Sequence, residues 1–212
     1  PIIAQATDIL QKASANTGDL TGIPSGFTKL DEITSGWQKS DLVIIAGRPA
    51  MGKTSFALSI AKNIAVDYNE PIAFFSLEMN NVQLVNRLIS NTCEISGSKI
   101  LSGQLSDEEW KRFDVKVRNL TGTPIYIDDT PGLSIFELRT KARRLVREKG
   151  VKLIMIDYLQ LMNANGIRFG NRQEEVSTIS RSLKGLAKEL DIPVLALSQL
   201  SRNVENREGL EG

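Results

Sequence analysis

The sequence predicts an α/β fold in which a mostly parallel sheet is flanked by helices. Five apolar runs of strand length alternate with segments whose apolar residues recur at helical spacing. The first run leads directly into a glycine-containing loop and another helical segment. Because parallel strands are joined by helical crossovers that cover the sheet, this alternation favours an α/β domain with helices on both faces.

Composition agrees with a single globular domain. The 212 residues are 41% hydrophobic and 24% charged, and their formal net charge of +1 does not by itself indicate a nucleic-acid partner. No apolar run approaches the ~20 residues of a membrane helix, and no secretory leader is recognisable. Cys93 is the single cysteine and histidine is absent, so we expect neither a disulfide nor a structural zinc site, and we expect a cytoplasmic protein.

The chain is predicted to divide into a short helix and loop over residues 1–18 and a larger domain over residues 19–212. Apolar residues recur at helical spacing from Ile2 to Ala13, and loop-forming residues follow. This helix could fold back on its own domain or lie on a neighbouring subunit. The residues alone do not decide between the two.

The first part of the larger domain is expected to hold two strands. Turn-forming residues dominate positions 21–37, where we expect Leu30 and Ile33 to anchor the core. A buried strand is expected at residues 41–46, directly before the glycine-containing loop and its helix. The second strand is expected at residues 71–77.

Later helices are recognised by their caps and their apolar spacing. Asn80 or Asn81 is expected to cap one helix, and Ser106 and Ser134 each open a capping box with a glutamate three residues later. Gly150 is expected to end the helix that follows Ser134. The apolar positions expected to face the core are Val82, Val85, Leu88 and Ile89 in the first of these helices and Val176, Ile179, Leu183, Leu186 and Leu190 in the last. The remaining strands are expected at residues 123–129, 152–157 and 193–198.

The loop between the first strand and its helix matches the phosphate-binding pattern G-x-x-x-x-G-K-[ST]. In such loops, backbone N–H groups surround phosphate oxygens and the positive end of the helix faces the same anion. Lys53 would reach the β and γ phosphates, and Thr54 would ligate Mg²⁺. A chance glycine turn is the alternative, but the strand before the loop and the helix after it favour nucleotide binding. The expected binding residues are Gly47, Arg48, Pro49, Ala50, Met51, Gly52, Lys53, Thr54 and Ser55.

Three polar residues follow apolar strands, where ligands of open α/β sheets bind. Asp157 is expected to hold Mg²⁺ opposite the loop, the alternative being a cap for the next turn. Glu78 could orient or deprotonate the water that attacks the γ-phosphate, or it could be a solvated residue at a strand end. Gln199 could sense the γ-phosphate or merely hydrogen-bond within its loop.

Several stretches resemble the C-terminal ATPase domain of the bacterial replicative DNA helicases of the DnaB family. Four motifs occur in the order that the family shows, and this combination is far more specific than the phosphate loop alone. The motifs are residues 47–55, 75–79 (Phe-Ser-Leu-Glu-Met), 153–160 (Leu-Ile-Met-Ile-Asp-Tyr-Leu-Gln) and 197–202 (Leu-Ser-Gln-Leu-Ser-Arg), and residues 21–27 and 171–176 are similar too.

The resemblance implies a RecA-like core in a homohexameric ring around single-stranded DNA, with ATP hydrolysis at the subunit interfaces driving translocation. It implies that Glu78 is the catalytic glutamate and that Gln199 is the γ-phosphate sensor. Together with Lys53, these residues form the expected catalytic set. It makes the helix at residues 2–13 the family's linker helix, which docks on the next subunit. Primase and a helicase loader are the further partners that the family suggests.

Two features of the family have no counterpart in these residues. One is the N-terminal collar domain. The other is the part beyond Gly212, where the family has a DNA-contacting loop, further strands and an arginine finger. An arginine finger is worth about 10³- to 10⁵-fold in rate, so we expect at most basal ATPase activity from these residues alone.

Arginines after two of the strands are candidates for DNA contact. Arg168, Arg172, Arg202 and Arg207 lie in predicted loops, where contacts to DNA phosphates would be independent of sequence and sensitive to salt. Solvated loop arginines are the alternative, and a solvated outer face explains the arginines of residues 139–147. Two other functions compete with a helicase motor: a RecA-like or KaiC-like ATPase, and a domain that binds nucleotide only to assemble.

Overall fold

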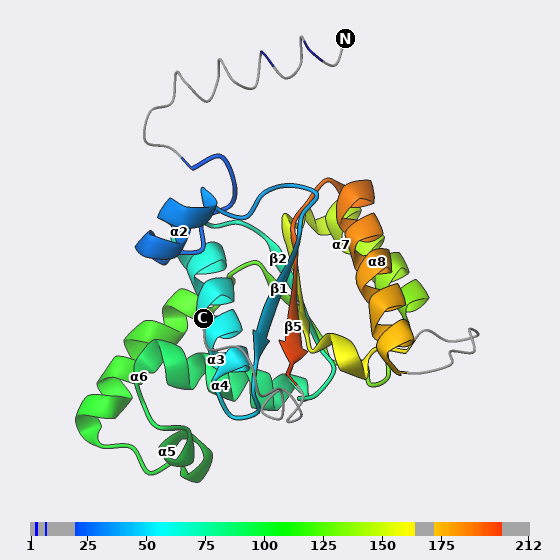
Figure 1. The fold of residues 1–212 in the computed structure, drawn as a ribbon. Helices are drawn as coiled ribbons and strands as arrows, with labels where there is room; N and C mark the ends of the chain where they lie inside the picture. The colour runs from blue at the N-terminus through cyan, green and yellow to red at the C-terminus, as the bar shows by residue number, and fades with distance from the viewer. Residues whose placement is uncertain (1–2, 4–6, 8–19, 164–171, 201–212) are drawn as a thin grey trace, which may run out of the picture.

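The computed structural model describes residues 3, 7, 20–163 and 172–200 of the chain (Figure 1). Its described residues form one five-stranded sheet in which each pair of neighbouring strands is parallel, in the order β1-β5-β4-β2-β3. All five predicted strands and the α/β fold are confirmed. The strands span Leu42–Gly47 (β1), Ile72–Ser76 (β2), Ile125–Asp128 (β3), Leu153–Asp157 (β4) and Val194–Gln199 (β5).

The helices connect and cover these strands. The helix predicted at residues 2–13 lies outside the described residues, apart from Ile3 and Thr7. None of the described helices is both long enough and apolar enough to span a bilayer. The helices span Thr28–Thr34 (α2), Lys53–Lys62 (α3), Asn81–Cys93 (α4), Gly97–Ser102 (α5), Asp107–Leu120 (α6), Ile135–Lys149 (α7) and Arg172–Leu190 (α8), with a π-helical turn at Asn63–Asp67 (η1) and a 3₁₀ turn at Leu159–Leu161 (η2).

The predicted helix caps are present. Asn80, rather than Asn81, caps α4, because its side chain accepts a hydrogen bond from the Gln83 N–H while the Gln83 side chain accepts one from the Asn80 N–H. Ser106 and Ser134 form the same reciprocal capping box at the starts of α6 and α7. Gly150 ends α7 in the left-handed conformation, at φ +66°.

Two apolar layers enclose the sheet. Helices α3 and α4 cover one face, and α7 and α8 cover the other (Figure 1). Along β2, Phe74 packs in the α3–α4 layer and Phe75 packs in the α7–α8 layer, as expected where successive side chains of a central strand point to opposite faces. Both phenylalanines are fully buried. The side chains of β2 are therefore buried on both faces of the sheet.

Some core expectations are wrong. Ile33 is 83% exposed, because α2 is a short helix that turns Leu30 toward the core and Ile33 toward solvent. Val82 and Val85 of α4 are also exposed, at 69% and 39%. Leu88 is buried as predicted, but its buried partner one turn earlier is Leu84, which has the same helical spacing as the predicted positions.

The strand before the loop is less buried than expected. In the described part of the chain β1 pairs only with β5, so it is an edge strand, and Ile44 is 44% exposed. An apolar run cannot show whether its strand lies at the centre or at an edge, because that depends on which strands pair. The short helices α2 and α5 were not predicted, since each has too few turns for a helical period to show.

Candidate nucleotide-binding site

The glycine-containing loop lies where the motif predicts, between the last residue of β1 and the first residue of α3. Gly52 caps α3 with φ +79°, in the region that favours glycine. Gly47 sits against the side chain of Lys53, where an added Cβ would lie 3.2 Å from Lys53 Cγ. The Lys53 ammonium reaches back across the loop and donates to the Arg48 carbonyl oxygen at 2.9 Å. The Lys53 ammonium group is therefore held against the backbone of the loop, at the start of α3.

Thr54 and Asp157 meet although they are far apart in the chain. The Thr54 hydroxyl donates to Asp157 Oδ2 at 2.8 Å, across a separation of 103 residues. Asp157 ends β4 and is 1% exposed. Burial raises the pKa of Asp157 and the nearby charge of Glu78 adds to this, while the hydrogen bond from Thr54 and the charge of Lys53 oppose it. A buried carboxylate beside a hydroxyl supplies the oxygen ligands that Mg²⁺ prefers, so these residues fit a magnesium site.

Glu78 follows β2 in a turn held by Ser76. The Ser76 hydroxyl donates to the Met79 carbonyl at 2.7 Å and accepts from the Met79 N–H at 3.3 Å. The register of β2 and β4 pairs Ser76 with Asp157. Glu78 itself is exposed, beside the buried carboxylate rather than in the core. Its turn therefore presents a carboxylate to the space above Asp157.

Gln199 ends β5 directly beside the loop. The register pairs Gln199 with Gly47, and the next residue, Leu200, donates its N–H to the Gly47 carbonyl at 3.1 Å. Gln160 of η2 holds this end of β5 from the other side. Its amide group donates to Ser198 Oγ at 2.8 Å and to the Gln199 carbonyl at 3.1 Å, and it accepts from the Gln199 N–H at 3.2 Å.

A cavity of about 200 Å³ joins these groups. It brings together the loop, Thr54, Asp157, Glu78 and Gln199 at the carboxyl edge of the sheet, where ligands of α/β folds bind. Sequence reasoning gave no site role to Tyr158, although it lies within the motif at residues 153–160, and it missed Arg87, which only the packing of α4 over the strand ends brings here. The lining residues are Pro49, Ala50, Gly52, Lys53, Thr54, Glu78, Met79, Arg87, Asp157, Tyr158 and Gln199.

The candidate DNA-contacting arginines cannot be placed around this cavity. Arg168, Arg202 and Arg207 lie outside the described residues. Arg172 is the first residue of α8, and the structure describes its backbone only. The basic face of α7 is exposed, as expected, but Arg139 and Arg143 both pair with Glu189 of α8 instead of standing alone.

The strand order and the loop after β1 define a P-loop α/β protein with a RecA-like core. Its candidate site joins that loop to carboxylates at the ends of two further strands. A family model described as the DnaB-like helicase C terminal domain matches residues 22–211, and the chain belongs to this family of nucleotide-dependent helicases.

The curated relatives are named replicative DNA helicases. Replicative DNA helicase DnaB of Geobacillus stearothermophilus is 49% identical over 207 residues, which are 98% of this chain and 46% of that protein. Replicative DNA helicase DnaC of Bacillus subtilis strain 168 is 48% identical over 207 residues, with the same coverage of 98% and 46%. The chain therefore spans about half the length of the curated relatives it matches.

Solved structures agree with the sequence relatives. One of them, a solved ATPase domain, superposes with a TM-score of 0.89 at 38% identity, covering 98% of this chain and 74% of that one. A DnaB-like replicative helicase, solved in a study of its interactions with primase, gives a TM-score of 0.85 at 38% identity, with coverage of 96% and 49%. These likenesses establish the RecA-like architecture of the chain.

Proposed function

We propose that this chain is the ATP-hydrolysing motor domain of a replicative DNA helicase, which couples hydrolysis to movement along single-stranded DNA and to duplex unwinding. The observation that carries the proposal is the contact between Thr54 and Asp157. It joins the residue after the loop's lysine to the carboxylate at the end of β4, at 2.8 Å. Membership in the DnaB-like helicase family supports the DNA-unwinding role, and the contact between Thr54 and Asp157 supports Mg²⁺-dependent ATP hydrolysis.

Each residue has a distinct role in this proposal. The loop N–H groups and the Lys53 ammonium bind the phosphates of ATP, and Thr54 and Asp157 hold Mg²⁺. When bound there, Mg²⁺ would offset the negative charge of the β and γ phosphates. Glu78 orients the attacking water and accepts its proton, a role that its exposed position beside the cavity allows. Gln199 senses the γ-phosphate and passes that state to the DNA-contacting residues that follow β5.

The proposed partners of the motor are those that its family suggests, and most of the residues proposed to contact them lie outside the described part of the chain. We infer a homohexamer around single-stranded DNA, with residues 1–18 as a linker helix that docks on the next subunit. Arg168, Arg172, Arg202 and Arg207 are proposed to contact DNA phosphates. A primase, a helicase loader and a cytoplasmic location complete the proposal, supported by the relatives named replicative helicases.

The test is phosphate release by the complete helicase that contains this domain. Lys53→Ala should lower ATP hydrolysis by about 10²- to 10³-fold, because it removes a cation that acts on the transferred phosphate. Lys62→Ala is the matched control, since Lys62 ends the same helix and pairs with Asp67 at 3.4 Å, outside the cavity. Turnover of Lys53→Ala at the level of Lys62→Ala would refute the assignment.

Strand displacement on a forked duplex separates a helicase from a recombinase or a regulatory ATPase. Unwinding that requires ATP, and that is lost in Lys53→Ala, supports the motor. Rings that assemble with ATP but show no hydrolysis stimulated by DNA would instead assign the domain to assembly alone.

A further inference from the structure

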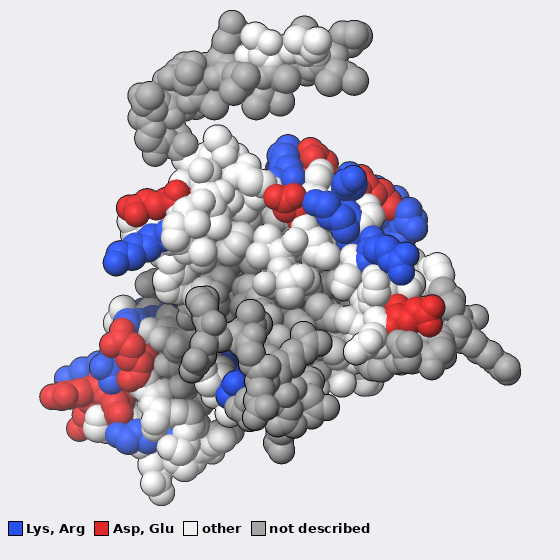
Figure 2. Space-filling model, viewed as in Figure 1, with Lys and Arg blue, Asp and Glu red and all other residues white. Residues whose placement is uncertain are grey.

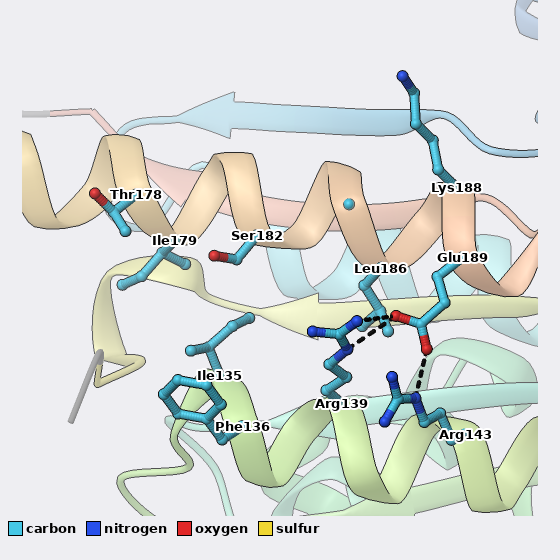
Figure 3. Close-up of a pocket in the computed structure, with 11 residues that line it drawn as sticks. Ile135, Phe136, Arg139, Arg143, Thr178, Ile179, Ser182, Leu186, Lys188 and Glu189 are labelled. Carbon is cyan, nitrogen blue, oxygen red and sulfur yellow. Dashed lines mark hydrogen bonds and ion pairs between the residues drawn. The ribbon is translucent and has the colours of Figure 1, made fainter. Parts of the chain in front are cut away.

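A groove between α7 and α8 takes no part in the proposed hydrolysis. Its volume is about 700 Å³, compared with about 200 Å³ for the nucleotide cavity, and it shares no lining residue with that cavity. One end of the groove is apolar. Phe136 stands at this end with 60% of its surface exposed, while Ile135 and Ile179 are buried beside it (Figure 3). A large exposed aromatic side chain over a buried apolar floor is typical of a binding site.

The other end of the groove is basic. Arg139 and Arg143 reach across from α7 and both donate to the Glu189 carboxylate on α8 (Figure 3). The hydrogen bond from Arg143, with that from Arg139, holds the pKa of Glu189 below its ordinary value, so this carboxylate stays charged and keeps both guanidinium groups in place. Lys188 also lines the groove, although its side chain points away from Glu189 in Figure 3.

The two arginines keep the capacity to bind a further anion. Their side chains are 50% and 52% exposed, and each guanidinium carries five N–H donors, of which the single Glu189 carboxylate accepts only some. Two fixed guanidinium groups against one carboxylate leave a net positive charge. Because Arg geometry matches carboxylate oxygens, this end of the groove is suited to a carboxylate from outside.

Gly185 keeps the middle of the groove open. A Cβ placed on Gly185 would meet no atom within 4 Å, so open space lies where its side chain would be. Glycine inside a helix costs about 1 kcal/mol relative to alanine, and Gly185 lies within the 19-residue helix α8. The residue therefore contributes room to the groove and nothing to the stability of the helix.

We propose that the α7–α8 groove binds an acidic segment of a partner protein, with an apolar side chain against Phe136 and Ile179 and a carboxylate on Arg139 and Arg143. Phe136 and Arg139 are three residues apart on one helix, a rise of about 4.5 Å. An amphipathic helix with its apolar and acidic residues about one turn apart on the same face matches that spacing.

Charge and polarity together favour a protein segment over nucleic acid. Lysine and arginine side chains gather over α7 and α8, which favours approach by any polyanion (Figure 2). A nucleic-acid backbone, however, carries a charge at every phosphate, whereas the apolar end of the groove offers Phe136, Ile135 and Ile179 as its surface. Only a ligand with one apolar and one anionic part uses both ends.

The probe is a fluorescent synthetic helical peptide that carries a leucine and, one turn along the same face, two glutamates. Anisotropy should show saturable binding to the chain. Gly185→Leu should weaken that binding by about tenfold, because the new side chain fills the groove, and Phe136→Ser should do the same by removing the apolar anchor. Leucine is a strong helix former at an exposed helix position, so Gly185→Leu should keep the fold.

Matched control variants distinguish binding in the groove from nonspecific binding to the protein surface. Arg144→Ala removes an arginine of α7 outside the groove, and Val115→Ser removes an exposed apolar side chain of α6, so both should leave peptide affinity unchanged. Unchanged affinity of Gly185→Leu, absence of saturable binding, or equal binding of a peptide with serine for leucine would overturn the proposal. Displacement by a single-stranded oligonucleotide, or self-association that Gly185→Leu abolishes, would also overturn it by assigning the groove to nucleic acid or to a second copy.

Discussion

Gln160 joins the ends of β4 and β5, and replacing it should loosen the position of Gln199 without disturbing the phosphate loop. The change that we propose is Gln160→Met, which keeps a similar volume but removes the amide group. The wild-type amide makes hydrogen bonds of 2.8, 3.1 and 3.2 Å to Ser198 and Gln199. All of them act on the last residues of β5.

The magnitude follows from these contacts. Each intramolecular hydrogen bond contributes about 0.5–1.5 kcal/mol net. Gln160 is half-buried and Gln199 is exposed, so water can replace part of the lost bonding. We therefore expect local destabilisation of about 1–2 kcal/mol, which corresponds to faster exchange of the Gln199 amide hydrogen by about tenfold.

Amide hydrogen exchange measured by NMR is the direct assay. Gln38→Met is the matched control, because Gln38 also makes several amide hydrogen bonds, including those to Thr21 Oγ1 and the Ser35 carbonyl at 2.9 Å, but lies away from the nucleotide cavity. Only Gln160→Met should change Gln199 exchange. ATP affinity should stay the same in both variants, whereas the hydrolysis rate of the complete helicase should fall with Gln160→Met alone.

An unchanged exchange rate at Gln199 would refute the claim that Gln160 holds the end of β5. Faster exchange combined with normal hydrolysis would keep the structural claim but refute the role of Gln199 in catalysis. A fall in hydrolysis with Gln38→Met as well would show that general destabilisation, rather than the position of Gln199, controls turnover.

Three further predictions concern stability and can be checked by thermal or denaturant unfolding. Asn80→Ala should cost about 1 kcal/mol, because it removes the side-chain cap of α4. Gly26→Ala should destabilise the fold by more than 1 kcal/mol, as roughly expected for a residue at φ +78° whose Cβ would lie 2.5 Å from Asn63. Lys141→Met should cost about 1–2 kcal/mol at neutral pH by removing its 2.6 Å contact with Asp128. Burial acts to raise the pKa of Asp128, but its hydrogen bonds, led by that from Lys141, hold the pKa below its ordinary value. The advantage of wild type over Lys141→Met should therefore be complete above about pH 3.9 and should shrink as the pH falls further.

Features encoded by neighbouring residues could be predicted from the sequence. Ser106 and Ser134 form capping boxes because the two partners in each box are three residues apart, and Gly150 ends α7 because a left-handed conformation favours glycine. The five strands were recognisable as apolar runs between turn signals. Such signals depend on no distant contact.

Choices between two equivalent patterns could not be predicted. On α4, both Val85 and Leu84 lie at helical spacing from the correctly predicted Leu88, and only packing in the layer with α3 buries Leu84 instead of Val85. In the same way, the apolar run of β1 does not show that β1 has a single described neighbour. The position of Arg87 at the nucleotide cavity likewise depends on how α4 lies over the sheet.

Sheet order explains why residues far apart in the chain can act together. The strands run β1-β5-β4-β2, so the strand ends meet the ligand edge in the spatial order Gly47, Gln199, Asp157 and Ser76, with Glu78 just beyond. Gln199 thus lies between the loop and Asp157, the proposed metal ligand, although it comes last in sequence. Gln199 pairs with Gly47 of the loop and lines the cavity, which is the position that the proposed sensor role requires. The hydrogen bonds from Gln160, which lies just after β4, then connect the segment after Asp157 to the proposed sensor, and for this reason Gln160→Met tests the sensor role without changing the phosphate loop.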